Sequence, residues 1–454
     1  MVVAMVSGAP RHKLRRATRL VAAFAALLLV GGVAACAVVS DEPADANAAL
    51  EQYRSAFARM RPGEIPPAMD DRNYKLFENI FHLVLAAYVK PASPTRLVDQ
   101  AWEGLWKKKA ENPSASERAL TESAIESMLT ALDPYSNFLN ADRVRDVREQ
   151  MHGEFPGLGI EVVIDKETGL LRVVGTDQNT PAARAGVRSG DLITRINDHN
   201  VKGVSLHDAV TAMRGPVGGS VTLELLRPGS DVPIQVFVTR AVVQVPSVVY
   251  RLLDNVAYIR IDYFGEQAAR LVREGLASMN LQAMGNLAGI VLDLRNNPGG
   301  LFEQGVNVAG IFLGAVDIVS TRDRDASVRH YKGRADDDVL PELPLMVLID
   351  SGTTSAAEVV AGALQDHHRA LLIGARSYGK GSVQTIFMLP GGDGLRLTTA
   401  RYFRPSGGPV ECFGITPNLE IKPAGRPLPA GLWPRAGSCP EAWCLRGPLC
   451  SSAG

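Results

Sequence analysis

Cysteine is scarce in this chain of 454 residues, and its few copies are unevenly placed. None lies between residues 37 and 411, and the five cysteines are Cys36, Cys412, Cys439, Cys444 and Cys450. The chain has no C-x-x-C pair and no His-rich cluster, which are the patterns that protein metal sites use. The sequence therefore predicts no metal centre and no other cofactor. The last three cysteines can pair with one another only if the compartment is oxidising.

An excess of charge of either sign is also missing. The chain has 48 basic and 48 acidic side chains and a pI of about 7.1. Because nucleic-acid-binding domains carry a basic excess, we expect no nucleic-acid partner. The hydrophobic content of 46% is ordinary for a soluble protein, and the length leaves room for two or three domains.

Residues 1–40 have the pattern of a targeting segment, with a basic region followed by the uncharged apolar run Leu20–Val39. Two interpretations stay open. In one, Val33-Ala34-Ala35-Cys36 resembles a bacterial lipobox, so that Cys36 is lipidated and becomes the mature N-terminus. In the other, the run crosses the bilayer as an uncleaved anchor behind cytoplasmic basic residues. We favour the lipobox; both predict a membrane-attached protein on the periplasmic side of a bacterial cell envelope.

The next two segments are not expected to carry chemistry. Residues 41–70 are rich in Ala and Pro and are predicted to be a loose linker. Residues 71–150 show apolar positions at helical spacing, which predicts helices from Asn73 to Tyr88 and over about 95–109 and 116–132. A turn, Leu132-Asp133-Pro134-Tyr135-Ser136, follows the last of these helices.

Residues 151–241 change to short β-rich runs separated by Gly and Pro. We expect strands over 159–164, 170–174, 191–196, 220–226 and 234–238, and one helix over 205–214. The loop Gly157-Leu158-Gly159-Ile160 precedes the first of these strands. Backbone N–H groups in such a loop can bind the terminal carboxylate of a peptide, which then adds to the sheet edge as a strand.

Residues 242–424 alternate between apolar runs typical of buried strands and helical patterns, which predicts a mixed α/β layer. The buried run Leu287–Arg295 ends in the turn Asn296–Gly300. The run Leu345–Ile349 ends in a turn of small residues that leads to Ser355 and then to a helix. A serine hydroxyl at a junction from strand to helix can lie beside free backbone N–H groups, which an oxyanion requires. Residues 425–454 form a tail rich in Pro, Gly and Cys that we expect to be disordered.

Lys380 lies between two glycines, and three interpretations of it compete. Residues 374–380 match the phosphate loop G-x-x-x-x-G-K, but Gly follows the lysine and the next residues alternate like a strand. Ser377 to Lys380 match S-x-x-K, but the glycines oppose the helical turn that this motif needs. In the third, Lys380 is a general base for Ser355, which requires burial to lower its pKa toward neutrality. His367 and His368 follow the predicted helix, and we expect neither to be the base.

The motifs around Ser355 and Lys380 resemble those of the carboxyl-terminal processing proteases, the S41 family of serine peptidases. Thr353–Val359 reads T-T-S-A-A-E-V against the family's T-A-S-A-S-E-I, and Gly379–Gln384 matches G-K-G-x-V-Q. The D-L-R-N-N-P-G-G segment Asp293–Gly300 is similar to the family's oxyanion segment, and Gly157–Ile160 resembles the carboxylate-binding loop of a PDZ domain. The resemblance implies an α+β multidomain fold: an N-terminal helical segment, a PDZ β-sandwich or barrel, and a mixed α/β protease core of the ClpP/crotonase-like type.

The resemblance also implies roles for individual residues. Ser355 would be the nucleophile, Lys380 the base and Gln384 the third member of the triad. The N–H groups of Ala356 and Gly300 would bind the oxyanion. The expected substrates are proteins or peptides captured through their C-termini by the PDZ domain. An activator or adaptor protein and a homo-oligomer stay open, and the alternative function is a catalytically silent envelope adaptor that has kept the fold.

Overall fold

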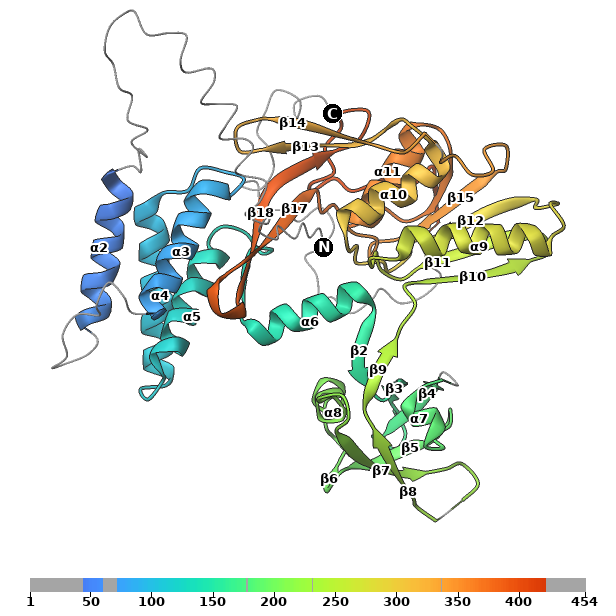
Figure 1. Cartoon of the computed structure of the whole chain (residues 1–454), viewed down its shortest axis with the longest axis horizontal. Coiled ribbons are helices and arrows are strands. Elements are labelled where there is room, and N and C mark those ends of the chain that lie inside the picture. The colour runs from blue at the N-terminus through green and yellow to red at the C-terminus, as the bar shows by residue number, and fades with distance from the viewer. Residues whose placement is uncertain (1–43, 60–71, 177–178, 231, 336, 422–454) are drawn as a thin grey trace, which may run out of the picture. The chain divides into compact units, whose positions relative to one another are not determined.

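The computed structural model describes residues 44–59, 72–176, 179–230, 232–335 and 337–421 (Figure 1). The predicted targeting segment with Cys36 and the predicted tail lie outside these residues. The chain divides into two compact units, a larger one up to residue 145 and from residue 248 onward, and a smaller one over residues 146–247. Each unit has its own hydrophobic core, so the two are described separately.

The larger unit is built on a sheet of six strands in the order β10-β11-β12-β15-β16-β19. β10 is antiparallel to β11, and every other neighbouring pair is parallel. The strands are β10 (Val248–Leu253), β11 (Val256–Ile261), β12 (Gly289–Asp293), β15 (Leu345–Ile349), β16 (Leu371–Gly374) and β19 (Leu419–Glu420). The helices that share its core are α9 (Ala268–Gln282), α10 (Phe302–Leu313) and α11 (Ala356–Asp366). The predicted mixed α/β layer is confirmed.

The register of this sheet brings two chain turns together. Asp293, the last residue of β12, pairs with Leu348 of β15. Because the two strands are parallel, the turn after Asp293 and the turn that leads to Ser355 leave the same edge of the sheet. Carboxyl ends of parallel strands are where α/β folds usually build their sites.

The larger unit has a second sheet, which includes the strand that follows Lys380. Its order is β1-β18-β13-β14, and β17 also pairs with β18. The strands are β1 (Asn137–Leu139), β13 (Asp317–Asp323), β14 (Val328–Lys332), β17 (Ser382–Met388) and β18 (Gly394–Phe403); a 3-10 turn, Pro390–Gly392, joins β17 to β18. The strand that follows the lysine loop is therefore β17, as the alternation predicted.

The N-terminal helices are α2 (Ala44–Arg59), α3 (Arg72–Ala87), α4 (Pro94–Glu111), α5 (Glu117–Thr130) and α6 (Ala141–His152). The three predicted helices are confirmed as α3, α4 and α5. The prediction of a loose linker over 41–70 is wrong for residues 44–59, which form α2. Ala46, Ala49, Leu50 and Tyr53 are buried and recur at helical spacing, so these small apolar residues form one face of a helix.

Helices α3–α5 belong to the same compact unit as the six-stranded sheet. Their cluster of buried side chains includes Leu395 and Leu397 of β18 and Phe138 of β1. The long β18 is thus shared: its first half packs on the helices, while Tyr402 near its end belongs to the core around the six-stranded sheet.

The smaller unit has a sheet in the order β3-β4-β5-β7-β8, with β6 paired to β5, and a separate pair β2–β9. The elements are β2 (Glu154–Gly157), β3 (Ile160–Ile164), β4 (Leu171–Thr176), α7 (Pro181–Arg184), β5 (Leu192–Ile196), β6 (His199–Asn200), α8 (Leu206–Met213), β7 (Ser220–Leu226), β8 (Ile234–Thr239) and β9 (Ala241–Gln244). The five predicted strands and the predicted helix are all present.

The described ranges contain no group of three or more His, Cys, Asp or Glu residues arranged to hold a metal ion. None of their helices combines the length and the apolar character needed to cross a bilayer.

Candidate active site

Ser355 lies at the junction that the sequence predicted, between the turn after β15 and the first residue of α11. Its backbone has φ 59° and ψ −117°, a conformation that residues with a side chain rarely adopt and that costs on the order of 1–3 kcal/mol. The residue is completely buried, and its Oγ has no hydrogen-bond partner in the described part of the chain. A strained serine with a free hydroxyl at such a junction has the backbone setting of a nucleophile.

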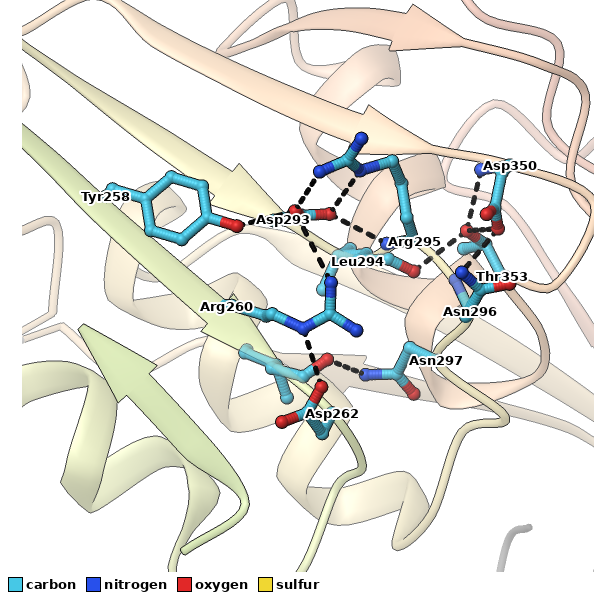
Figure 2. Close-up of polar contacts among 11 residues, drawn as sticks. Tyr258, Arg260, Asp262, Asp293, Leu294, Arg295, Asn296, Asn297, Asp350 and Thr353 are labelled. Carbon is cyan, nitrogen blue, oxygen red and sulfur yellow. Dashed lines mark hydrogen bonds and ion pairs between the residues drawn. The ribbon is translucent and has the colours of Figure 1, made fainter. Parts of the chain in front are cut away.

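The turn before Ser355 is fixed by its own side chains and by the neighbouring turn. The hydroxyl of Thr353 accepts the N–H of Asp350 at 2.9 Å and donates to the carbonyl oxygen of Leu294 at 2.9 Å. The carboxylate of Asp350 accepts the N–H of Asn296 at 2.9 Å (Figure 2). The two turns that leave the edge of the sheet are therefore joined by direct hydrogen bonds.

Asn297 is buried and fixes the turn that follows β12. Its side chain donates to the carbonyl oxygen of Ile261 at 2.7 Å and accepts the N–H of Gly299 at 2.8 Å. Its own carbonyl oxygen accepts the N–H of Thr354 at 2.9 Å. A fully buried asparagine thus links β11, the glycine pair and the turn of Ser355.

Both the backbone conformation at residue 300 and the lack of room for a side chain there require glycine. Its φ is 147°, and a Cβ there would lie 2.3 Å from the carbonyl oxygen of Phe264. In the described chain the N–H groups of Gly300 and Ala356 donate to no other group. The helices that follow them touch, because a Cβ on Gly305 would lie only 3.0 Å from the carbonyl oxygen of Ala356. Two free backbone donors on neighbouring helix starts suit an oxyanion.

Asp293 and Arg295 form a structural ion pair at the same edge. Figure 2 shows the carboxylate of Asp293 held by Arg295 and by the hydroxyl of Tyr258, with Arg260 beside it. Burial alone would raise the pKa of Asp293, but the hydrogen bonds from Arg295 and Tyr258 lower it below its ordinary value. The carboxylate is therefore a fixed anchor for the turn.

Glu358 joins the backbone of Ser355 to that of Lys380. Its completely buried carboxylate accepts four hydrogen bonds: from the N–H of Ser355 at 2.8 Å, the hydroxyl of Ser377 at 2.5 Å, and the N–H groups of Gly379 and Lys380 at 2.7 and 2.9 Å. Burial raises its pKa, although the four donors oppose that rise. One carboxylate thus fixes two chain segments that are far apart in sequence.

Tyr402 makes a second link between the same two residues. Its hydroxyl lies 3.0 Å from the carbonyl oxygen of Ser355 and within hydrogen-bond distance of the carbonyl oxygen of Lys380. The ring is buried at the end of β18, where it also packs near Phe302. Sequence reasoning missed both Glu358 and Tyr402 as site residues. Glu358 is detectable from its place three residues after Ser355 at a helix start, whereas no local pattern marks Tyr402.

The environment of Lys380 lowers the pKa of its amine. Burial is the main cause that lowers its pKa, to about 8, and the nearby positive charge of Arg396 acts in the same direction. Three carboxylates oppose this shift, those of Glu411, Asp133 and Glu358. Burial therefore acts on the pKa of this lysine in the direction that the general-base interpretation requires.

Gln384 lies on β17 and is completely buried. Its amide nitrogen donates to the hydroxyls of Ser382 and Thr398 at 2.9 and 3.4 Å, while its Oε1 has no partner among the described residues. Within the same ranges no hydrogen bond joins Ser355 Oγ to Lys380, or Gln384 Oε1 to Lys380. The structure therefore holds the three side chains on adjacent elements without these bonds.

The competing interpretations of this region do not fit the geometry. The strand β17 follows Lys380 where a phosphate loop requires a helix, and residues 377–380 form no helical turn. The hydroxyl of Ser377 is bound to Glu358. His367 ends α11, at the opposite end from Ser355, and its Nε2 lies 2.7 Å from the carbonyl oxygen of Asp317.

The loop of Gly157, Leu158, Gly159 and Ile160 belongs to the smaller unit and joins β2 to β3. Gly159 has φ 72°, and a Cβ on it would lie 2.3 Å from Thr180. The carbonyl oxygen of Leu158 accepts the N–H of Ala182 at 2.9 Å, which fixes the loop against α7. β3 is the end strand of its sheet and pairs only with β4 among the described strands. An unpaired strand edge beside a glycine loop is the geometry that adds a peptide strand.

Known proteins resemble both units. Residues 255–421 match peptidase family S41, and residues 172–227 match the PDZ domain. The carboxy-terminal-processing protease of Bartonella bacilliformis is 42% identical over 315 residues, which cover 69% of this chain and 71% of that protein. The carboxyl-terminal-processing protease of Synechocystis sp. is 34% identical over 329 residues, which cover 71% and 76% of the two chains.

A solved structure adds a likeness of fold. A protein of Bacteroides fragilis described as an S41 protease has a TM-score of 0.51 at 17% identity, with 79% of this chain and 92% of that chain covered. The predicted combination of helical segment, PDZ domain and protease core is thereby confirmed. The chain therefore belongs to peptidase family S41 and is a serine peptidase of the carboxyl-terminal-processing group that carries a PDZ domain.

Proposed function

We propose that this protein is a bacterial envelope endopeptidase that cleaves proteins near their C-termini, with Ser355 as nucleophile and Lys380 as general base. The observation that carries the proposal is the carboxylate of Glu358, which accepts the backbone N–H groups of both residues at 2.8 and 2.9 Å. Burying a carboxylate costs free energy unless hydrogen bonds compensate for the lost water. The carboxylate of Glu358 has four such donors, and two of them come from a serine with a free hydroxyl and a lysine of lowered pKa.

The chemistry follows from these groups. Ser355 Oγ attacks the scissile carbonyl carbon while neutral Lys380 takes its proton, and the N–H groups of Ala356 and Gly300 stabilise the oxyanion. The C–N bond then breaks, and Lys380 gives the proton to the leaving amine. In the second half a water molecule attacks the acyl-enzyme, its proton passes to Lys380 and then to Ser355, and the new carboxyl end is released.

The lowered pKa makes Lys380 a workable base near neutral pH. With a pKa of about 8, roughly one lysine in ten is neutral at pH 7. Gln384 is proposed to orient the amine during the reaction, since its Oε1 is buried and unpartnered and can accept an N–H of Lys380. The hydrogen bond from Ser355 to Lys380 would then form when substrate binds, as happens in enzymes whose resting sites are loosely aligned.

The PDZ domain is proposed to capture the C-terminus of the substrate. The loop Gly157–Ile160 supplies backbone donors for the terminal carboxylate, and the open edge of β3 supplies a place for the added strand. Capture raises the local concentration of nearby peptide bonds and so favours cleavage close to the C-terminus.

Attachment to the periplasmic side of the membrane, through a lipid on Cys36 or through the run Leu20–Val39, remains part of the proposal. An activator or adaptor protein and a homo-oligomer are further expected partners. These rest on the sequence alone.

Cleavage by the purified full chain in detergent tests the function. A protein with an unstructured C-terminal extension and the same protein with its C-terminus amidated serve as substrates. We expect cleavage of the first, slower cleavage of the second, and none by Ser355→Ala or Lys380→Ala variants that keep the wild-type circular dichroism. Peptide binding without any turnover by the wild type would instead establish the silent adaptor. A cleavage assay outweighs labelling with fluorophosphonates, because some serine–lysine enzymes resist them.

A further inference from the structure

The sequence predicts no chemistry for the turn Leu132–Ser136, but hydrogen bonds fix its conformation. The buried carboxylate of Asp133 accepts the N–H of Tyr135 at 2.8 Å, the N–H of Ser136 at 2.7 Å and the hydroxyl of Ser136 at 2.9 Å. The hydroxyl of Ser136 also accepts the N–H of Thr398 on β18 at 3.2 Å. The turn is therefore fixed to β18. This strand pairs with β17, which is the strand that follows the loop of Lys380.

The ring of Tyr135 faces the amine of Lys380. The Nζ atom lies 4.4 Å from the ring centroid, well within the range of a cation–π contact. The electron-rich face of the ring attracts an ammonium group, while a neutral amine gains almost nothing from it. The hydroxyl of Tyr135 is bonded to Tyr378, and burial raises its pKa, so that the phenol stays neutral while Lys380 titrates.

Other charged groups act electrostatically on the same amine. They are Arg396 on β18, Glu358 on α11, Asp133 in the turn before β1 and Glu411 in the segment after β18, with the neutral phenols of Tyr378 and Tyr402 nearby. In the described chain Nζ has no ion pair. The ring of Tyr135 thus contacts the amine directly and favours its protonated form over its neutral form.

We infer that Tyr135 is a positioning residue that holds the protonated amine of Lys380 on its ring face and lets the neutral amine turn toward Ser355. The inference rests on the proposed role of Lys380 as the base. When Lys380 takes the proton of Ser355, the new ammonium gains the ring contact, so the turn from the helical region stabilises the charge that the reaction creates. A residue of the helical region thereby serves the chemistry of the protease core.

Graded fluorination of the ring tests this inference with little change in shape. In the full chain, position 135 is made Phe, 4-fluoro-Phe, 3,5-difluoro-Phe and 3,4,5-trifluoro-Phe; each fluorine weakens the ring face for a cation. The pKa of Lys380 is measured from the ¹³Cε shift of labelled lysine in the Ser355→Ala background, with Lys380→Met to assign the signal. We expect the pKa to fall along the series by about 0.5 unit or more from Phe to the trifluoro ring.

Kinetics give the second readout. In the Ser355 enzyme the acidic limb of kcat/KM against pH should move to lower pH in the same order, and Tyr135→Leu should move it at least as far as the trifluoro ring. Tyr378→Phe, which removes only the hydroxyl partner, should leave the limb in place. A pKa that is constant or rises along the series overturns the inference even if cleavage is normal. Normal cleavage by Lys380→Ala overturns the proposed base instead, while the titration still reports on the ring contact.

Discussion

The carboxylate of Glu358 accepts the backbone N–H of Ser355 at 2.8 Å and so fixes the positive φ of the proposed nucleophile. The same carboxylate binds the backbone of Lys380. The proposed nucleophile and base are thus positioned relative to each other through their main chains. Neither reactive side chain takes part in the hydrogen bonds that fix this arrangement.

Replacing Glu358 by Gln should disrupt both segments. The amide group has two N–H donors where the backbone also presents donors, so at least one of the four accepted bonds is lost and a buried donor is left unpaired. We expect kcat/KM to fall on the order of 100-fold and the free energy of unfolding to fall by about 2–4 kcal/mol. Urea unfolding and peptide cleavage measure the two effects. Glu303→Gln, an exposed change in the first turn of α10, is the matched control; equal behaviour of the two variants would remove Glu358 from the site.

Tyr402→Phe isolates the second link. The ring keeps its packing, but the hydroxyl between the carbonyl oxygens of Ser355 and Lys380 is lost. We expect a loss of about 1 kcal/mol in unfolding free energy and a roughly tenfold drop in kcat with little change in KM, because alignment and not substrate contact is affected. Tyr331→Phe, whose ring also packs on Phe302, serves as control. A change confined to KM would contradict this role.

Glu411 should make stability fall as pH rises. Its carboxylate accepts the N–H of Gly381 at 2.8 Å, and burial is the main cause that raises its pKa to about 7 from an ordinary 4.5. The folded state therefore holds this proton more tightly than the unfolded chain does, so its stabilising effect is complete below pH 4.5 and is lost as pH rises through 7.

The Glu411→Gln variant isolates this effect. Relative to it, the wild type should lose on the order of 2 kcal/mol of unfolding free energy between pH 4 and pH 8. Urea unfolding across this range measures the difference, and Glu342→Gln, an exposed change, should show none. A difference between wild type and Glu411→Gln that does not vary with pH would refute the prediction.

Gly159→Ala should damage the smaller unit locally. The added Cβ would lie 2.3 Å from Thr180, and φ is 72°, so we expect a local loss of about 1–3 kcal/mol. Hydrogen exchange of the full chain should report faster exchange within residues 146–247 and unchanged exchange in α9–α11. At Gly157 a Cβ would meet nothing within 4 Å, so Gly157→Ala is the control. Equal exchange in both variants would show that the loop tolerates the extra atom.

Local patterns were enough for the parts of the site that each lie within one short segment. The apolar run before Ser355 and the helical spacing after it predicted the junction from strand to helix, because burial periodicity is a property of a few consecutive residues. The alternation after Lys380 predicted β17 in the same way. The strands around Gly157–Ile160 were also found from short runs and turn residues, since an antiparallel sheet of this kind is built from neighbours in the chain.

The sequence did not predict features that depend on small residues or on contacts between segments far apart in the chain. Residues 44–59 looked like a linker because alanine marks a helix face only weakly, yet they bury Leu50 and Tyr53 in α2. Nothing in the sequence of the helical region indicates that Leu395 and Leu397 of β18 complete its core. Tyr402 and Tyr135 went unnoticed for the same reason: each reaches the lysine loop from another element.

The amino-acid sequence was sufficient, then, to place Ser355 at a strand-to-helix junction and Lys380 between two glycines before a strand, because burial periodicity and turn residues are properties of short segments. The roles proposed for these residues and for the loop Gly157–Ile160 rest on the resemblance to the family. The folded chain was needed to show how these pieces are joined. A hydrogen bond or a cation–π contact depends on distances of a few ångströms in space, and such distances between Glu358, Tyr135, Tyr402 and Lys380 arise only when parallel strands align their carboxyl ends and β18 packs against both cores.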